Sequence, residues 1–349
     1  MLSVDNATPY AVAAIPYADK HGRDGLAVVA KGTFEIAGPG EPVALADEQE
    51  PVAFADAWHG EPGASSLRYA ADSTPPKPGA DVALVGHAYP PTADAREFDV
   101  SLQVGERIHV VRVFGDRHWE RGLLGWRPTP PEPVERVPLV YERAFGGADL
   151  CPSDPAKHAF EPRNPVGTGF VGRGGRERLR DLALPNLEDP GAPIGRPKDR
   201  PAPAGFGFVA PAWSPRAERA GTYDDAWQRD RCPLLPLDFD ERFFHAAHPA
   251  LCSPQPLAGG ERVRIVNASR DGTLDFRLPA ESLAVTAWIR GEPVRGESRL
   301  DTVVIEPDAR RLVAVWRAAI PCPRTLLYVQ YVFVKRAGDA RGDARAEVA

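Results

Sequence analysis

The chain has 349 residues, with 42 lysines and arginines against 48 aspartates and glutamates, so its formal net charge is −6 at pH 7. An acidic chain without a basic patch is not typical of nucleic-acid-binding proteins, so the composition argues against a nucleic-acid partner. The 38 prolines and 32 glycines favour short strands joined by turns over long helices.

The sequence also bears on the cellular compartment. The N-terminal segment has no basic stretch before an apolar run, so no secretory signal is expected. The longest strongly apolar run, Leu326–Val334, is too short to span a bilayer as a helix. No tight spacing typical of a disulfide framework relates the four cysteines, Cys151, Cys232, Cys252 and Cys322. We therefore expect a cytoplasmic protein without a membrane partner.

The first predicted elements form a hairpin. Two apolar segments, Pro9–Tyr17 and Leu26–Phe34, are separated by the polar segment Asp19–Gly25, which ends in Asp-Gly. Apolar runs bounded by such turn residues are typical of paired strands. The segment Gly38–Asp56, rich in proline and glutamate, is expected to follow a sheet edge.

Four further strands are predicted before residue 147. Apolar and polar residues alternate in Glu97–Val104 and Arg107–Phe114, and Gly105-Glu106 between them suits a tight turn. This period of two indicates strands with one buried face. We also predict strands at Asp81–Tyr89 and Leu139–Arg143.

A long central stretch, Leu184–Pro249, is rich in proline and glycine but also in aromatic residues. Its aromatic residues are Phe206, Phe208, Trp213, Tyr223, Trp227, Phe239, Phe243 and Phe244. Disordered segments are poor in aromatic residues, so we expect an ordered loop held by buried rings. Long ordered loops with little regular structure are usually functional.

Helix is expected only in short pieces within this stretch. Ser214-Pro215-Arg216 offers an N-cap serine followed by proline at the first helical position. A second helix is predicted from Thr222–Asp225 to Arg231, and a third over Asp238–Ala247.

Strands return after the central stretch, with turn residues about every ten positions, a spacing typical of a β-sandwich or barrel. They are predicted at Arg262–Asn267, Thr273–Leu278, Ser282–Arg290, Thr302–Ile305, Leu312–Ala318 and Thr325–Val334. The fold is therefore predicted to be mainly β, with antiparallel sandwich or barrel-like sheets and a long, ordered, Pro/Gly/aromatic-rich central insertion with a few short helices.

This interpretation divides the chain into four parts. Residues 1–147 form an N-terminal β region, and residues 148–258 a loop-rich central insertion with short helices. Residues 259–334 form a C-terminal β region, and residues 335–349 a frayed tail. The two β regions can form one compact unit.

The run Gly167–Gly172 matches the G-x-G-x-x-G pattern of dinucleotide-binding proteins. That function requires a strand before the pattern and a helix after it, so that phosphate meets a helix N-terminus. The residues on either side fit neither element. We interpret the run as a flexible glycine loop and predict no cofactor.

A metal site is conceivable where His245, His248 and Cys252 lie close in sequence. The two histidines share a face if the segment is helical. Pro249 ends any such helix, however, and no further ligands stand at the spacing of a four-ligand zinc site. No metal is predicted.

Acidic residues offer an enzymatic alternative. Asp224, Asp225 and Asp240 supply carboxylates for a carbohydrate- or peptidoglycan-directed hydrolase if two of them converge on a cleft. The competing interpretation places them at the N-termini of short helices, where negative charge is favourable. A sugar-binding module with exposed flat rings is a further alternative.

Several motifs, in order and spacing, resemble one bacterial family. They are Leu139–Gly147, Asn164–Phe170, Leu184–Glu188, Pro203–Gly207, Trp213–Arg219 and Gly221–Trp227. From Pro9 to about Val334 the chain resembles the family called domain of unknown function 2169, an accessory family of type VI secretion. Phe208 stands where that family's pattern leads us to expect proline.

The resemblance implies a cytoplasmic adaptor or chaperone and no enzyme. Such proteins are thought to stabilise a secreted effector or load it onto a spike protein or a PAAR-tip protein. The family offers no catalytic residues to transfer.

Interface hot spots favour Trp, Tyr and Arg, so we place the contact surface on the central insertion and adjacent sheet edges. The candidate contact residues are Trp213, Arg216, Tyr223, Asp224, Asp225, Trp227 and Arg229. The alternative, that these rings only pack the loop itself, stays open.

Overall fold

A computed structural model describes residues 2–123, 125–150, 154–172, 179–180, 182–322 and 326–339. The described chain is mainly β, as predicted, with one short α-helix and several single turns of 3-10 helix. Cys151, Thr325 at the start of the last predicted strand and the part of the tail beyond residue 339 lie outside the described residues.

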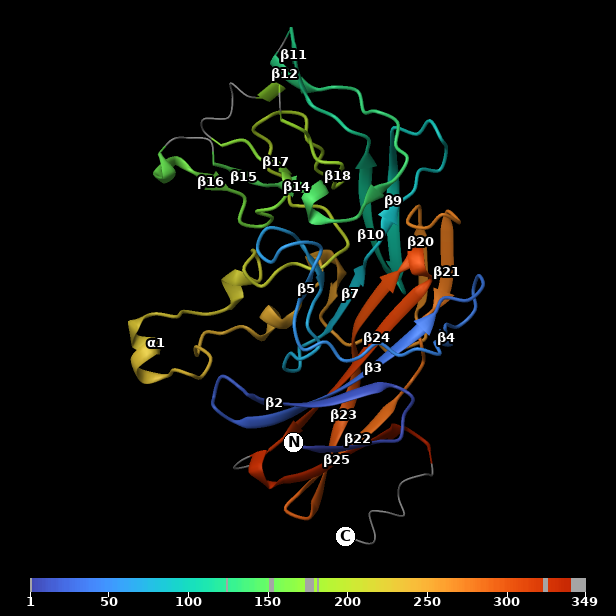
Figure 1. The fold of residues 1–349 in the computed structure, drawn as a ribbon, viewed down its shortest axis with the longest axis vertical. Coiled ribbons are helices and arrows are strands. Elements are labelled where there is room, and N and C mark those ends of the chain that lie inside the picture. The colour runs from blue at the N-terminus through green and yellow to red at the C-terminus, as the bar shows by residue number, and fades with distance from the viewer. Residues whose placement is uncertain are drawn as a thin grey trace.

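A ten-stranded sheet makes the larger half of the molecule, and it curls into a nearly closed barrel (Figure 1). Its strands run in the order β1 (Ser3–Asn6), β25 (Val329–Arg336), β22 (Leu283–Ile289), β23 (Glu292–Glu306), β24 (Arg311–Pro321), β3 (Asp24–Glu35) and β2 (Ala11–Ala18). Three further strands branch from this path: β7 (Ala80–Leu84) pairs in parallel with β23, β4 (Ala44–Leu45) pairs with β3, and β19 (Cys252–Ser253) pairs with β7.

A five-stranded antiparallel sheet packs against the barrel. Its order is β18 (Leu187–Glu188), β10 (Arg107–Phe114), β9 (Glu97–Val104), β20 (Arg262–Val266) and β21 (Thr273–Arg277). One apolar cluster joins the two sheets, because Val100 and Ile265 of this sheet share it with Leu312 and Trp316 of β24. Both sheets contain strands from the N-terminal and the C-terminal β regions, and side chains from both regions share one apolar cluster.

The remaining elements are short. The strands are β5 (Ala57–Trp58), β6 (Leu67–Tyr69), β8 (His87–Ala88), β11 (Trp119–Gly122), β12 (Gly125–Pro128), β13 (Val137–Pro138), β14 (Phe145–Gly146), β15 (Ala148–Asp149), β16 (Ala159–Phe160) and β17 (Thr168–Gly169). The helices are η1 (Tyr141–Arg143), η2 (Pro155–Lys157), η4 (Ala217–Arg219), α1 (Asp225–Asp230), η5 (Glu241–Phe244), η6 (Pro249–Leu251), η7 (Pro307–Ala309) and η8 (Leu326–Tyr328).

The first predicted hairpin is confirmed as β2 and β3, but its turn lies earlier than expected. The turn is centred on Gly22, whose φ is +74°, and the Asp19 carboxylate accepts hydrogen bonds from the backbone N–H groups of His21 and Arg23. Asp24 and Gly25, the predicted turn residues, begin β3. Gly25 is needed there because a Cβ atom would lie 2.5 Å from the ring of Tyr17.

Other boundaries also differ from the prediction. The predicted strand Leu139–Arg143 is wrong, because residues 141–143 form the 3-10 helix η1 around the buried ring of Tyr141. The strand β1 was not predicted, and β23 begins ten residues before the predicted Thr302, at Glu292. Exposed charged residues alternate with half-buried ones in that early part of β23, so it lacks the apolar signal used for the prediction.

The helix predictions in the central stretch have mixed outcomes. α1 confirms the second, with Asp224 as its N-cap. The first is wrong at Ser214-Pro215, which is a cis peptide followed by the single turn η4. The third shrinks to the four residues of η5.

The central stretch itself is ordered, as its aromatic content predicts. Phe206 and Phe208 are 0% and 1% exposed, and their backbones bond to the β regions. The N–H of Leu84 in β7 donates to the carbonyl of Phe206, and Phe208 forms single bridges with Leu67 and Ala247. The apolar run Leu326–Val334 belongs mainly to β25, and no helix in the described ranges has the length and apolar character needed to cross a bilayer.

The glycine run 167–172 is closely packed, which corrects the predicted flexible loop. Thr168 and Gly169 form β17, which pairs in parallel with β14. A Cβ atom on Gly167 would lie 2.3 Å from Nδ2 of Asn164, a buried side chain that donates to the carbonyls of Tyr141 and Phe145. The glycines therefore allow two backbone segments to approach each other.

Candidate functional site

The clearest surface feature is an arm made of residues 222–238, which carries α1 at its tip and projects away from the sheets (Figure 1). Hydrogen bonds between Thr222 and Asp238 close its base: the Thr222 N–H and hydroxyl donate to the two carboxylate oxygens at 3.1 and 2.7 Å. The Thr222 hydroxyl, followed by its N–H group, lowers the pKa of Asp238. We call this segment the arm.

Three contacts hold the arm rigid from within. The Asp224 carboxylate accepts the backbone N–H of Trp227 at 2.8 Å and starts α1. The indole Nε1 of Trp227 donates to the carbonyl of Leu234 at 2.8 Å, which ties the helix to the returning chain. The ring of Tyr223 meets the Trp227 ring edge to face at 4.6 Å.

The arm is also attached to the barrel, beside the turn between β2 and β3. The ammonium of Lys20 donates to the carbonyl of Phe239 at 3.0 Å, and the guanidinium of Arg231 donates to the carbonyls of Lys20 and Leu235. Leu234 lies against the turn glycine Gly22. A long loop held at its base and side in this way keeps one orientation.

The arm exposes apolar and charged side chains together. Tyr223 is 51% exposed and Leu237 is 59% exposed, while Trp227 is half-buried. Asp224, Asp225 and Arg229 are also exposed on the arm. Exposed aromatic and aliphatic side chains together with charged ones are typical of protein–protein contact sites.

Two of the predicted contact residues lie in the interior. Trp213 is 5% exposed, and its ring meets the buried Tyr141 ring edge to face at 5.8 Å. Arg216 is 6% exposed, and its guanidinium donates to the carbonyls of Val209 and Phe243. Both hold the insertion in place, which is the packing role that the sequence left open for these residues.

The three acidic residues considered for a hydrolase have separate roles. Asp224 caps α1, and Asp225 lies exposed in the first turn of that helix. Asp240 caps η5 and is bound by the guanidinium of Arg242, whose hydrogen bonds hold the pKa of that carboxyl below its ordinary value. These carboxylates act as helix caps and ion-pair partners, so they do not form the two-carboxylate cleft of a hydrolase.

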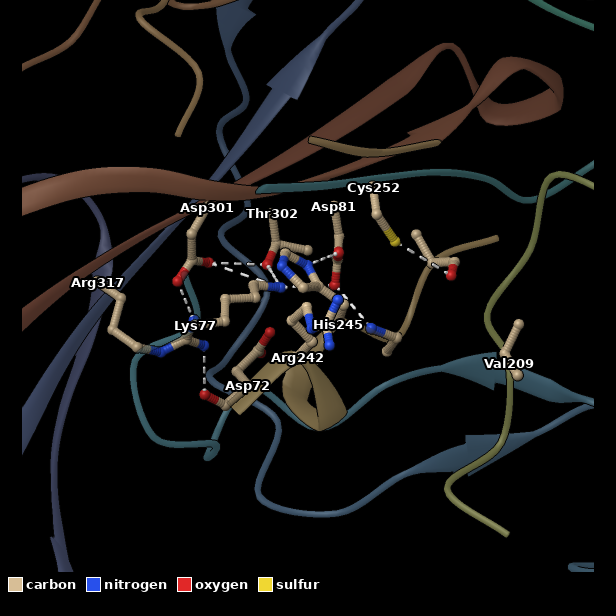
Figure 2. Close-up of polar contacts among 12 residues, drawn as sticks. Asp72, Lys77, Asp81, Val209, Arg242, His245, Cys252, Asp301, Thr302 and Arg317 are labelled. Atoms are coloured by element: carbon tan, nitrogen blue, oxygen red, sulfur yellow. Dashed lines mark hydrogen bonds and ion pairs between the residues drawn. The ribbon is translucent and has the colours of Figure 1, made fainter. Parts of the chain in front are cut away.

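Beneath the insertion lies a buried charged cluster that the sequence did not predict (Figure 2). The carboxylate of Asp81 in β7 is 0% exposed and accepts from Lys77 at 2.7 Å, from Nδ1 of His245 at 2.6 Å and from the N–H of Ala246 at 2.9 Å. Burial would raise the pKa of Asp81, but the Lys77 charge and the His245 hydrogen bond together hold it well below its ordinary range. The cluster fastens the insertion to the barrel.

The same cluster bears on the metal prediction. Ligand atoms of Asp81, His245 and Cys252 lie within 4.8 Å of one another. A cation placed among them would meet the buried Lys77 ammonium and displace bonds that the carboxylate already accepts. Burial also raises the pKa of the Cys252 thiol, which disfavours the thiolate that binds metals. The arrangement therefore fits a structural role.

His248 lies apart from this cluster. Its ring stacks on that of His109 in β10 at 4.7 Å between centroids, and its Nε2 lies 3.2 Å from the carbonyl of Pro203. Nδ1 of His248 accepts the backbone N–H of Ala250, so Nε2 is the donor of a neutral ring. The two histidines that were weighed as metal ligands therefore point to different partners.

A pocket of about 190 Å³ lies beside the charged cluster, between the segment 50–72 and the outer face of the barrel. Phe208, Val304 and Val313 make an apolar floor. The charged groups at its wall are paired: Lys31 with Asp72, and Arg311 with Glu50 and Glu306. These charged groups are therefore engaged in ion pairs within the protein.

Comparison with known proteins places the chain in a family. A family model described as "Uncharacterized protein conserved in bacteria (DUF2169)" matches residues 21–317. No curated protein and no solved structure matches the chain. The family resemblance drawn from the motifs is thereby confirmed, and the description assigns no activity, substrate or partner to the family.

Proposed function

Because the chain belongs to the uncharacterized bacterial family DUF2169, we propose that it is a cytoplasmic, non-enzymatic adaptor that binds and stabilises a secreted type VI effector. In this role it helps load the effector onto the PAAR-tipped spike. The type VI part of the proposal rests on the motif resemblance described above.

One structural observation supports the binding role: the arm exposes Tyr223 and Leu237, and hydrogen bonds hold the arm in one conformation. An exposed ring and an aliphatic side chain cost free energy when they stay in contact with water, and they gain it in an interface. The fixed conformation of the arm supports the proposal further, because binding to a surface that is already ordered costs less conformational entropy.

The catalytic alternative has less support from the same residues. A hydrolase requires carboxylates that converge on substrate, whereas Asp224 and Asp240 are committed to backbone N–H groups of their own helices. The sugar-binding alternative requires flat exposed rings. Tyr223 and Trp227 instead meet edge to face, with Trp227 half-buried.

The double variant Tyr223→Ala, Leu237→Ala is expected to weaken effector binding by about 30- to 1000-fold, since hot-spot residues contribute about 1–2 kcal/mol each. Both side chains are more than half exposed, so the melting temperature should stay close to that of the wild type. The measurement is co-purification and titration with the effector encoded by the neighbouring gene.

The matched control is Ile108→Ala, an apolar side chain that is 63% exposed on β10 in the other sheet. This variant should bind like the wild type. Failure of the wild-type chain to retain the effector, with no change in effector solubility, would contradict the proposed function.

A further inference from the structure

The outer edge of β2 is open. This strand ends the order of the ten-stranded sheet, and it pairs with β3 alone among the described strands. The other end of the sheet is β1, which reaches β2 through the turn at Ala7–Tyr10. Val4 of β1 and Val12 of β2 pack half-exposed on the same apolar cluster inside the barrel, so both free edges border one seam.

The register shows which backbone groups of β2 point outward. Pro16 lies opposite Leu26, and a proline has no N–H to donate to the neighbouring strand. The N–H of Asp19 donates to the carbonyl of Arg23, just beyond the end of β2. Hydrogen-bonded pairs occur at every second residue of an antiparallel pair, so the odd-numbered residues of β2 form the hydrogen bonds with β3. The N–H and C=O groups of Val12 and Ala14 therefore point away from β3.

Side chains of the same chain form hydrogen bonds with the outward backbone groups of Tyr10, at the start of this edge, but not with those of the residues that follow. The outward N–H of Tyr10 donates to the hydroxyl of Thr8, and its carbonyl accepts from the side chain of Asn6. From Val12 onward no described group takes over this role. The groups from Val12 to Ala14 therefore remain available to an added strand.

The side chains of Ala11–Ile15 carry no charge on either face. Edge strands are usually protected by charged residues, proline or bulges, because a flat apolar edge is a template for another strand. Here protection begins only at Pro16. Ala11, Ala13 and Ala14 are small, so larger side chains of a neighbouring strand find room beside them.

We propose that the outer edge of β2 binds an extended segment of the secreted effector by strand addition, a proposal that rests on the adaptor function above. The segment is uncharged, with β-branched or aromatic residues on both faces, because it packs beside apolar side chains on both sides of the sheet. The edge continues into the arm: the turn at its end carries Lys20, whose carbonyl accepts from Arg231 of the arm. This continuity favours the partner that contacts the arm over a second copy of the chain.

The test uses short overlapping synthetic peptides that cover the sequence of the effector encoded beside this chain's gene. The wild-type chain should bind one or more peptides with apolar residues at successive positions. The variant Ala14→Pro removes an outward N–H, leaves the hydrogen bonds to β3 in place and repeats the arrangement at Pro16. We expect it to bind those peptides about tenfold or more weakly.

Ala18→Pro is the matched control, because it removes an outward N–H beyond Pro16 and should leave peptide affinity unchanged. Equal affinity of the wild type and Ala14→Pro, or no bound peptide, would overturn the proposal. Dimers of the wild type that become monomers in Ala14→Pro would also overturn it and would identify a second copy as the occupant. If the arm variant loses the whole effector while Ala14→Pro retains it at full affinity, strand addition is wrong and the adaptor function stands.

Discussion

Replacement of Asp81 by alanine should lower the free energy of unfolding by about 3–5 kcal/mol, because it removes the nearest charged partner of the buried Lys77 ammonium. The Lys77 side chain is 5% exposed, and Asp81 is the carboxylate nearest to it, at 2.7 Å. The hydroxyl of Thr302 accepts a second bond from Lys77 but carries no charge. The carboxylate of Asp301 lies 4.0 Å from the ammonium and is already paired with Arg317. The loss is large against the total stability of about 5–15 kcal/mol that is usual for a protein domain.

The measurement is urea-induced unfolding at neutral pH, compared with the double variant Lys77→Met, Asp81→Leu. The double variant removes both charges, so it should recover much of the loss. Recovery should be incomplete, because the N–H of Ala246 and the ring of His245 lose their acceptor. A loss below about 1 kcal/mol in Asp81→Ala would contradict the structural role given to this cluster.

Acidification should destabilise the fold through the stacked histidines. Burial, followed by repulsion from His109, lowers the pKa of His248 from its ordinary 6.5 to about 4, and burial also lowers that of His109. The carbonyls of Gly205 and Pro203 and the charge of Asp189 act in the opposite direction. The net effect keeps both rings neutral in the folded protein near pH 7.

The direction of the pH dependence follows from these pKa values. Between pH 6.5 and 4 the unfolded chain binds more protons at position 248 than the folded chain, so stability is complete above pH 6.5 and falls as the pH drops toward 4. The loss from His248 should reach up to about 3 kcal/mol, an upper figure because the residue is partly exposed. Urea unfolding at several pH values tests it.

His248→Gln removes one titrating group and should flatten the stability profile in that interval, where His109 and His59, whose pKa values are also lowered by burial, continue to titrate. Carboxylates with lowered pKa values, such as Asp81, lose their contribution at more acidic pH, so the two effects separate. A profile of His248→Gln that matches that of the wild type would show that the stacked pair does not control the acid response.

The prediction from the sequence succeeded where the local pattern decides the structure. The alternation in Glu97–Val104 and Arg107–Phe114 predicted β9 and β10 with the tight turn between them, and Thr222–Asp225 predicted the start of α1. The aromatic content of the central stretch predicted its order, because rings such as Phe206 and Phe208 are buried between the β regions.

The prediction failed where distant residues decide. Glu292–Leu300 reads as a polar segment, yet it continues β23 because β22 and β24 pair with it. The buried cluster joins Lys77 and Asp81 to His245, and no spacing in the sequence brings these residues together. An aspartate at the start of an apolar run, as at Asp81 and Asp301, is a weak signal of a buried ion pair.

The predicted contact residues also depend on contacts that the local sequence does not show. Sequence composition selected seven residues of the insertion for a contact surface, but composition does not say which way a ring points. Trp213 and Arg216 hold the insertion from inside, while Tyr223 and Arg229 are exposed on the arm. Leu237 was missed because a single leucine between proline and aspartate carries no periodic signal.

Hydrogen–deuterium exchange of the chain, alone and in its complex with the effector, tests the central claim most directly. Two segments should become protected on binding: residues 222–238 of the arm and residues 11–15 of β2. The sheet formed by β20 and β21 serves as the internal reference and should keep its exchange rate. Protection confined to that sheet, with the arm and β2 unchanged, would contradict the account.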